Sequence, residues 1–334
     1  MLVPILLLLV GFAILIKGAD FLVNGASSAA KKYGISNLAI GLTVVAFGTS
    51  MPELIVSLVS ALDGNNDASF GNVIGSNNFN LLFILGISGA IYPLVVQTNT
   101  VKYEVPMSLL AALVLYVLVN DTQLFGSTAF SAPYGGSLNR WDGIILLLFF
   151  LGFLVYIYRT MRTSADLGEE STIKIYSTPI ATLMIVAGLV MLIFGGQIVV
   201  DNAIEIAQHY GLSEKLIGLT ILAAGTSLPE LATSCVAAYK KNTDIAIGNV
   251  VGSNIFNIFF ILGITSTIHP VPYNMAMNFD LQVLMASTVL LMIFMFTLNT
   301  RKLDRWEAII MLGAYFAYTA YLVSIDQIQT AAAQ

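Results

Sequence analysis

The sequence predicts an all-α membrane protein in which ten transmembrane helices form two inverted five-helix repeats. Three observations predict this fold: the composition, an internal repeat, and the distribution of lysine and arginine. Of the 334 residues, 57% are hydrophobic and 10% are charged, and the mean hydropathy is +0.85. Apolar runs of helix-spanning length follow one another along the chain, which favours a helical bundle over a β-barrel. The small net charge of -5, without a basic stripe, argues against a nucleic-acid partner.

The apolar runs predict ten spanning helices. Helices 2, 3, 7 and 8 are expected to be broken, because glycine, proline and polar residues interrupt their apolar runs. The ten expected spans are residues 3–29, 36–62, 69–92, 105–120, 141–159, 179–207, 214–239, 245–269, 280–299 and 304–324.

A second copy of residues 33–93 begins 177 positions further along the chain. Aligned without a gap, 33–93 and 210–270 share 34 identities in 61 positions. Each copy belongs to a half with five expected helices, an odd number, so the second half enters the membrane from the opposite side. The expected units are a first repeat over 1–165, a second over 174–334, and a short cytoplasmic linker over 159–178.

The positions of lysine and arginine predict the orientation. Of the 14 such residues, 11 fall in the loops after the odd-numbered helices, two fall on the other face, and Lys17 lies within helix 1. An excess of positive loops marks the cytoplasmic side, so both termini of this multi-pass cell inner (plasma) membrane protein are expected outside. Lys17 lies three residues before Asp20, which predicts an ion pair or a lysine that reaches to the interface. The loop residues that set this bias are Lys31, Lys32, Lys102, Arg159, Arg162, Lys174, Lys240, Lys241, Arg301, Lys302 and Arg305.

A carboxylate stands inside the apolar run of expected helix 2. Glu53 follows Gly48-Thr49-Ser50-Met51-Pro52, and an ionised carboxylate at this depth costs at least ~2.5 kcal/mol unless it is partnered. Glu230 repeats the arrangement in the second half. In inverted halves the two carboxylates meet at one midplane, where they repel unless protons or cations lie between them. A buried base is the other possible partner, but the nearby lysines lie at the cytoplasmic end. A divalent cation therefore fits best.

Both segments offer further oxygen atoms. Pro52 and Pro229 lack an N–H, so carbonyls near 46–49 and 223–226 are expected to be free to coordinate a cation. The neighbouring hydroxyls either bind a cation or bond to carbonyls of their own helix. These hydroxyls belong to Thr49, Ser50, Thr226 and Ser227.

A second polar motif follows each carboxylate. Residues 71–80 read GNVIGSNNFN and return at 248–257 as GNVVGSNIFN. Helix packing alone accounts for the glycines, but not for amide and hydroxyl side chains in the same turns. The complete set of ligands is all oxygen, which suits Ca2+ or Na+ rather than zinc or copper. In each copy a serine and an asparagine four residues apart share a helical face; they are Ser76 with Asn80, and Ser253 with Asn257.

The paired motifs resemble the alpha repeats of the cation/Ca2+ exchanger superfamily, and of its prokaryotic sodium/calcium exchanger branch in particular. The resemblance covers essentially the whole chain. It implies a central Ca2+ site shared by Glu53 and Glu230, with Asn80 and Asn257 lining the centre. Backbone oxygens of Thr49 and Thr226 would complete this site. The resemblance also implies a Na+ site toward the cytoplasm at Ala46, Thr49, Ser50, Glu53 and Ser76, and its mirror toward the outside at Ala223, Thr226, Ser227, Glu230 and Ser253.

Some relatives carry aspartate at one of the two positions held here by Asn80 and Asn257. With asparagine at both, Glu53 and Glu230 carry all the charge of the cation-free site, which argues mildly against K+ coupling. The resemblance implies a secondary antiporter that exchanges Na+ for Ca2+ by alternating access, with shared and competing ion sites. Expected helices 1 and 6 would slide across the core. No cofactor, no enzymatic activity and no obligatory protein partner are expected beyond the two ions and the lipid bilayer.

Other functions remain open on the sequence. An H+/Ca2+ antiporter of the same fold would use the two glutamates as proton carriers, whereas the hydroxyls of Ser76 and Ser253 favour sodium. A K+-dependent Na+/Ca2+ antiporter is a further alternative. An intramembrane protease would be expected to carry aspartates rather than glutamates, and a channel does not require mirrored halves. The single cysteine, Cys235, excludes an intrachain disulfide and is expected to be a buried spectator thiol.

Overall fold

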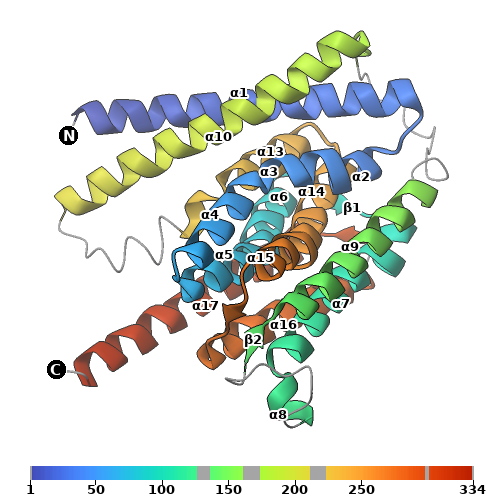
Figure 1. Ribbon diagram of the computed structural model, residues 1–334. Helices are drawn as coiled ribbons and strands as arrows, with labels where there is room; N and C mark the ends of the chain where they lie inside the picture. Colours follow the sequence, from blue (N-terminus) through green and yellow to red (C-terminus); the bar gives the residue numbers. More distant parts are fainter. Residues whose placement is uncertain (1, 126–135, 161–173, 211–222, 298–300, 333–334) are drawn as a thin grey trace.

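The computed structural model describes residues 2–125, 136–160, 174–210, 223–297 and 301–332 (Figure 1). Within these residues, eight helices are long and apolar enough to cross a membrane, and one bent helix pair makes a ninth candidate. The bent pair corresponds to expected span 36–62. Expected span 214–239 begins outside the described residues and continues as α12 (Ala223–Gly225) and α13 (Leu228–Tyr239). The structure is thus a largely helical membrane protein.

Two long helices form a layer on one side of the molecule. They are α1 (Leu2–Tyr33) and α10 (Thr178–His209), and each has 32 residues. Figure 1 shows them crossing each other above the remaining bundle. A Cβ added at Gly188 would lie 2.7 Å from the Leu22 nitrogen and 2.8 Å from the Gly18 carbonyl oxygen. The two backbones therefore touch where glycine has no side chain, a packing mode that is common between membrane helices.

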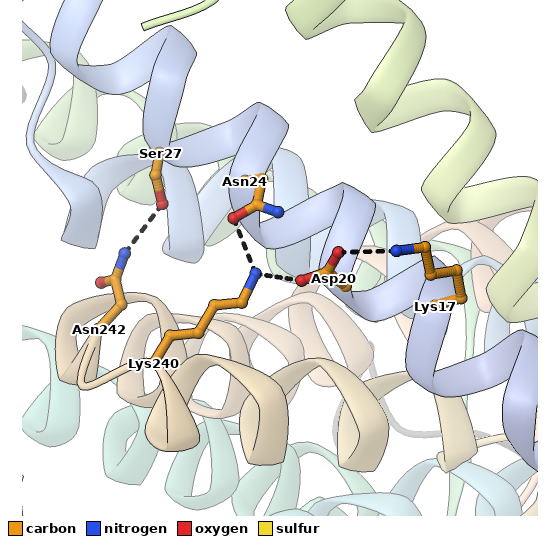
Figure 2. Close-up of polar contacts among 6 residues, drawn as sticks. All are labelled: Lys17, Asp20, Asn24, Ser27, Lys240 and Asn242. Atoms are coloured by element: carbon orange, nitrogen blue, oxygen red, sulfur yellow. Dashed lines mark hydrogen bonds and ion pairs between the residues drawn. The ribbon is translucent and has the colours of Figure 1, made fainter. Parts of the chain in front are cut away.

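Polar side chains join α1 to the helices beneath it (Figure 2). The Lys240 ammonium, at the end of α13, pairs with Asp20 and donates to Asn24 Oδ1 at 2.7 Å. Asn242 Nδ2 donates to Ser27 Oγ at 2.9 Å. The predicted Lys17–Asp20 ion pair is confirmed at 3.5 Å. The sequence did not indicate the contact with Lys240, because this lysine belongs to the other half of the chain.

The central layer contains two bent helices. In the first, α2 (Asn37–Ile40), η1 (Gly41–Val45) and α3 (Ala46–Thr49) lead to Ser50, where the axis bends by 46° into α4 (Met51–Leu62). Proline in the first turn of a helix needs no N–H, so Pro52 begins α4 favourably while preventing continuation from α3. The Thr226–Ser227 turn between α12 and α13 repeats this construction, with Pro229 in the first turn.

The other two central helices contain π-helical turns and otherwise continue. One runs through α5 (Asn66–Asn78), η2 (Phe79–Ile84) and α6 (Leu85–Ile91). Its counterpart runs through α14 (Thr243–Ile255), η5 (Phe256–Leu262) and α15 (Gly263–Ile268). The interruptions expected in spans 69–92 and 245–269 thus take the form of π-helical segments within single 26-residue helices. Such segments are frequent at functional sites.

Close helix packing fixes the centre of the bundle. A Cβ at Gly248 would lie 2.9 Å from the Leu38 carbonyl oxygen, and one at Gly252 would lie 2.9 Å from the Leu42 Cα. The glycines of the second polar motif therefore let α14 approach η1 to backbone contact. The segment that the repeat would place against Gly71 and Gly75 lies in 211–222, outside the described residues.

The remaining helices cover the side opposite α1 and α10, or flank the centre (Figure 1). They are η3 (Thr100–Glu104), α7 (Val105–Val119), α8 (Asp121–Phe125), α9 (Arg140–Thr160), η6 (Met275–Met277), α16 (Asn278–Phe294) and α17 (Arg305–Ala332). Between α7 and α9, Asp121–Phe125 form α8 and Ser137–Leu138 form strand β2. Cys235 is a free thiol 4.0 Å from Ser88 Oγ, and it is only partly buried, which corrects the expected full burial.

Two short antiparallel strand pairs connect the halves. Strand β1 (Leu94–Val95) pairs with β4 (Lys302–Leu303), and β2 (Ser137–Leu138) pairs with β3 (Val271–Pro272). Strand β3 occupies the position in the second half that β1 occupies in the first, so the two pairs are reciprocal. Each half contributes one strand to each pair.

Candidate functional site

Two carboxylates are buried at the centre of the bundle. Glu53 lies in the first turn of α4 and Glu230 in the first turn of α13, and both side chains are 0% exposed. Acidic residues are favoured in the first turn of a helix, where free N–H groups create a positive potential. Burial nevertheless removes the carboxylates from water, so their oxygens need partners.

Each carboxylate is held by a serine from the opposite half. Ser227 Oγ donates to Glu53 Oε1 at 3.0 Å, and Ser50 Oγ donates to Glu230 Oε1 at 2.9 Å. Ser50 immediately precedes α4, and Ser227 immediately precedes α13. Each bent turn thus provides one carboxylate and the hydroxyl that binds the other carboxylate. The arrangement requires both halves.

The threonines beside these serines form a second pair of contacts between the halves. Thr49 Oγ1 donates to Asn249 Oδ1 at 3.1 Å, and Thr226 Oγ1 donates to Asn72 Oδ1 at 3.2 Å. Thr49 Oγ1 also lies 3.1 Å from the Val45 carbonyl of its own helix. The alternative of hydroxyls bonding to their own helix therefore holds in part for Thr49, whereas Ser50 reaches across to the other half.

Asn72 and Asn249 hold the backbone beneath the carboxylates. Asn72 Nδ2 donates to the Glu53 carbonyl at 3.1 Å and to Ser57 Oγ at 2.8 Å. The corresponding Asn249 contacts, to the Glu230 carbonyl and to Ser234 Oγ, measure 3.3 and 2.9 Å. Neither asparagine was among the predicted site residues. The signal that could have found them is the amide that opens both copies of the second motif, which glycine packing does not explain.

Four acceptor oxygens at the centre are buried without a hydrogen-bond partner among the described residues. They are Glu53 Oε2, Glu230 Oε2, Asn80 Oδ1 and Asn257 Oδ1. The side chains of all four residues are at most 1% exposed. Buried polar atoms are nearly always paired, so an unpartnered set related by the repeat calls for an additional group. A cation satisfies acceptor oxygens directly, because carboxylate and amide oxygens are preferred Ca2+ ligands.

The remaining predicted site residues differ in their contacts. Ser253 Oγ lies 3.4 Å from Glu230 Oε1. Ser76 is equally buried, but its Oγ has no hydrogen-bond partner among the described residues. The Ala46 carbonyl accepts the Ser50 N–H at 3.0 Å, so it is not wholly free as the position of Pro52 suggested. Ala223 is the first residue of α12, and its side chain lies outside the described part of the chain.

Comparisons with known proteins agree on one family. The model of the sodium/calcium exchanger protein family matches residues 3–159 and 180–324. The putative antiporter CaxA of Alkalimonas amylolytica is 39% identical over 332 residues, which cover 97% of this chain and 100% of that protein. The sodium/calcium exchanger MaX1 of Methanosarcina acetivorans is 31% identical over 354 aligned positions, which cover 97% of this chain and 99% of that protein. A solved structure of the sodium-calcium exchanger NCX_Mj, soaked with Na+ and Ca2+, has a TM-score of 0.79 at 30% identity and covers 96% of this chain and 98% of that chain.

The fold and the site define a multi-pass helical membrane protein with a buried oxygen centre shared by two similar halves. The comparisons then identify the family: this chain belongs to the sodium/calcium exchanger family and is a membrane antiporter. The resemblance that the two motifs indicated is thereby confirmed.

Proposed function

We propose that this protein exchanges Na+ for Ca2+ across the cell membrane, with both ions competing for one centre. The observation that carries the proposal is the set of four buried acceptor oxygens without a partner among the described residues. Two are carboxylate oxygens, so one Ca2+ would neutralise both glutamates. Asn80 and Asn257 would contribute neutral amide oxygens, and water or backbone carbonyls would complete the six to eight oxygens that Ca2+ prefers.

Sodium would compete through the ligands that surround these four oxygens. In one half Na+ would use oxygens of Ala46, Thr49, Ser50 and Ser76 together with Glu53, and in the other half oxygens of Ala223, Thr226, Ser227 and Ser253 together with Glu230. Na+ carries one charge where Ca2+ carries two, so neutral hydroxyl and carbonyl oxygens with a single carboxylate suit it. Because Na+ and Ca2+ would use the same carboxylates, full occupancy by one ion would expel the other.

The architecture proposed for this function is ten helices in two inverted repeats, over 1–165 and 174–334, with a cytoplasmic linker over 159–178. The reciprocal serine–glutamate contacts and the reciprocal strand pairs support an approximate two-fold relation between the halves. Figure 1 draws the start of α1 and the end of α17 at the left of the bundle, which supports an even number of crossings. The excess of positive loops supports placing both ends outside.

Alternating access would come from movement of α1 and α10 over the centre. The two helices contact each other along their backbones at Gly18 and Gly188, so they are suited to move as one unit. Polar contacts at Lys240 and Asn242 join α1 to the bundle, and Leu189 of α10 packs against Gly48 of the first bent helix. Movement of the two helices would exchange these contacts for others while the four central oxygens stay in place.

The deciding experiment is Ca2+ uptake into proteoliposomes. An outward Na+ gradient is expected to drive uptake, and a pH gradient without Na+ is expected not to. Glu53→Gln should abolish uptake, while Glu205→Gln, which alters an exposed carboxylate on α10, should retain it. Uptake driven only by the pH gradient would overturn sodium coupling in favour of protons, and a requirement for K+ would favour the K+-dependent alternative. Exchange retained by Glu53→Gln would refute the shared carboxylate site.

A further inference from the structure

Two asparagines, Asn77 and Asn254, form a closed hydrogen-bond ring between the halves, and Asn80 and Asn257 each bond to one side of this ring. Asn80 Nδ2 donates to Asn254 Oδ1 at 3.0 Å, and Asn257 Nδ2 donates to Asn77 Oδ1 at 2.9 Å. Asn254 Nδ2 donates to the Asn77 carbonyl at 3.3 Å, and Asn77 Nδ2 donates to the Asn254 carbonyl at 3.2 Å. Asn77 and Asn254 are both 0% exposed. Every contact of the ring joins one half of the protein to the other.

We propose that Asn77 and Asn254 are positioning residues that force Asn80 and Asn257 to present oxygen, and not N–H, to the transported cation. This inference rests on the proposed function and deepens it. Asn77 and Asn254 would not bind the ion themselves. They would decide which end of each neighbouring amide faces it.

The two backbone carbonyls determine the direction of every amide in the ring. A carbonyl only accepts hydrogen bonds, so the side-chain atom of Asn254 that faces the Asn77 carbonyl must be its Nδ2. The Oδ1 of Asn254 is then directed to Asn80, whose facing atom must be a donor. Asn80 therefore directs its Nδ2 toward the ring and turns its Oδ1 away. The same steps, begun at the Asn254 carbonyl, turn the Oδ1 of Asn257 away from Asn77.

A reversed amide would leave unfavourable contacts at two places. If Asn80 turned its oxygen toward Asn254, two acceptor oxygens would face each other at about hydrogen-bond distance. Reversing Asn254 as well would only transfer that conflict to the Asn77 carbonyl. A buried polar group left without its partner costs about 1–3 kcal/mol. The ring thus fixes the orientation of the Asn80 and Asn257 amides through neutral hydrogen bonds, without a charged group.

This orientation accounts for the unpartnered oxygens at the centre. Asn80 Oδ1 and Asn257 Oδ1 are the two amide atoms that the ring leaves free, and both are fully buried. An amide with its N–H pointing to the centre would instead repel a cation. Positions 77 and 254 would therefore influence cation affinity without touching the ion.

A double-mutant cycle on Ca2+ affinity tests the proposal, because Asn254 acts through Asn80, and Asn77 acts through Asn257. Ca2+ binding to purified protein is measured by calorimetry and by the Ca2+-dependent rise in unfolding temperature. We expect Asn254→Ala to weaken Ca2+ binding about tenfold, which corresponds to about 1.4 kcal/mol. In an Asn80→Ala background, Asn254→Ala should add less than twofold, whereas Asn77→Ala should still add about tenfold.

Two controls separate positioning from general damage. Asn78→Ala removes an adjacent buried amide that donates to the Asp280 carbonyl outside the ring, and it should leave Ca2+ affinity within twofold. If Asn254→Ala does not fold, the similarly shaped Asn254→Leu replaces it in the cycle. Equal losses from Asn254→Ala with and without Asn80 would overturn the proposal. A wild-type protein that binds no Ca2+ would instead contradict the proposed function, so the two failures are distinguishable.

Discussion

The close contact between α1 and α10 predicts that a side chain added at Gly188 destabilises the protein. In Gly188→Ala, the new Cβ would lie 2.7 Å from the Leu22 nitrogen and 2.8 Å from the Gly18 oxygen. An ordinary contact of this kind is 3.4 Å or longer, and both neighbouring atoms are backbone atoms that no rotamer change can move. The helices must therefore separate by roughly 0.7 Å or more at the crossing, and overpacking of this type costs about 1–3 kcal/mol.

Gly196 provides the matched control on the same helix. A Cβ at Gly196 would meet only Pro229 Cδ among the described residues, at 3.9 Å. Thermal unfolding of the detergent-solubilised protein should show a clear loss of stability for Gly188→Ala and almost none for Gly196→Ala. Gly188→Ala should also lower the maximal transport rate, while half-saturating Ca2+ stays within twofold because the substitution lies away from the central oxygens. Equal unfolding temperatures for the two variants would refute the close approach of α1 and α10.

Three further predictions concern polar contacts. Lys240→Met should shift the balance between the two access states about fivefold, since a partly exposed ion pair contributes up to about 1 kcal/mol. Lys241→Met, which alters an exposed neighbouring lysine, should not shift this balance. Accessibility labelling on both sides of the membrane measures the balance. Ser227→Ala should raise half-saturating Ca2+ tenfold or more, because hydrogen bonds to charged groups contribute about 1.5–3 kcal/mol, and an unchanged value in uptake assays would contradict the contact with Glu53. Tyr156→Phe should lower the unfolding temperature by removing the partner of the buried Glu104, without changing ion affinity.

The helical membrane class and the principal residues of the candidate site could be predicted from the sequence, because both leave local signals. The composition and the length of the apolar runs directly indicate membrane-spanning helices. The constant offset between the two copies indicates that one half of the chain is a duplicate of the other. A carboxylate within an apolar run is costly in any membrane fold, so it stands out in the sequence. Glu53 and Glu230 could thus be identified, and so could the oxygen-rich turns beside them. The membrane sides of the loops and the identity of the coupled ion stay predictions.

Contacts between the halves could not be predicted, because the atoms involved lie far apart along the chain and no local pattern links them. The two serines could have bonded to their own helices, yet each reaches the carboxylate of the other half. The sequence shows that Asn72 and Asn249 are amides beside packing glycines, but only the structure places them beneath Glu53 and Glu230. The π-helical form of the expected breaks likewise depends on packing that no local pattern contains.

The residues of the candidate site can be read from the sequence: two carboxylates, their hydroxyl neighbours and two amide-rich motifs, in a chain that must lie in a membrane. Which of their oxygens remain free depends on the tertiary structure. Glu53 Oε2, Glu230 Oε2, Asn80 Oδ1 and Asn257 Oδ1 are left after the other polar side-chain atoms of the same residues have found their partners. The physical reason is that hydrogen bonds between the halves consume specific donors and acceptors, and these pairings exist only when the two copies are packed against each other.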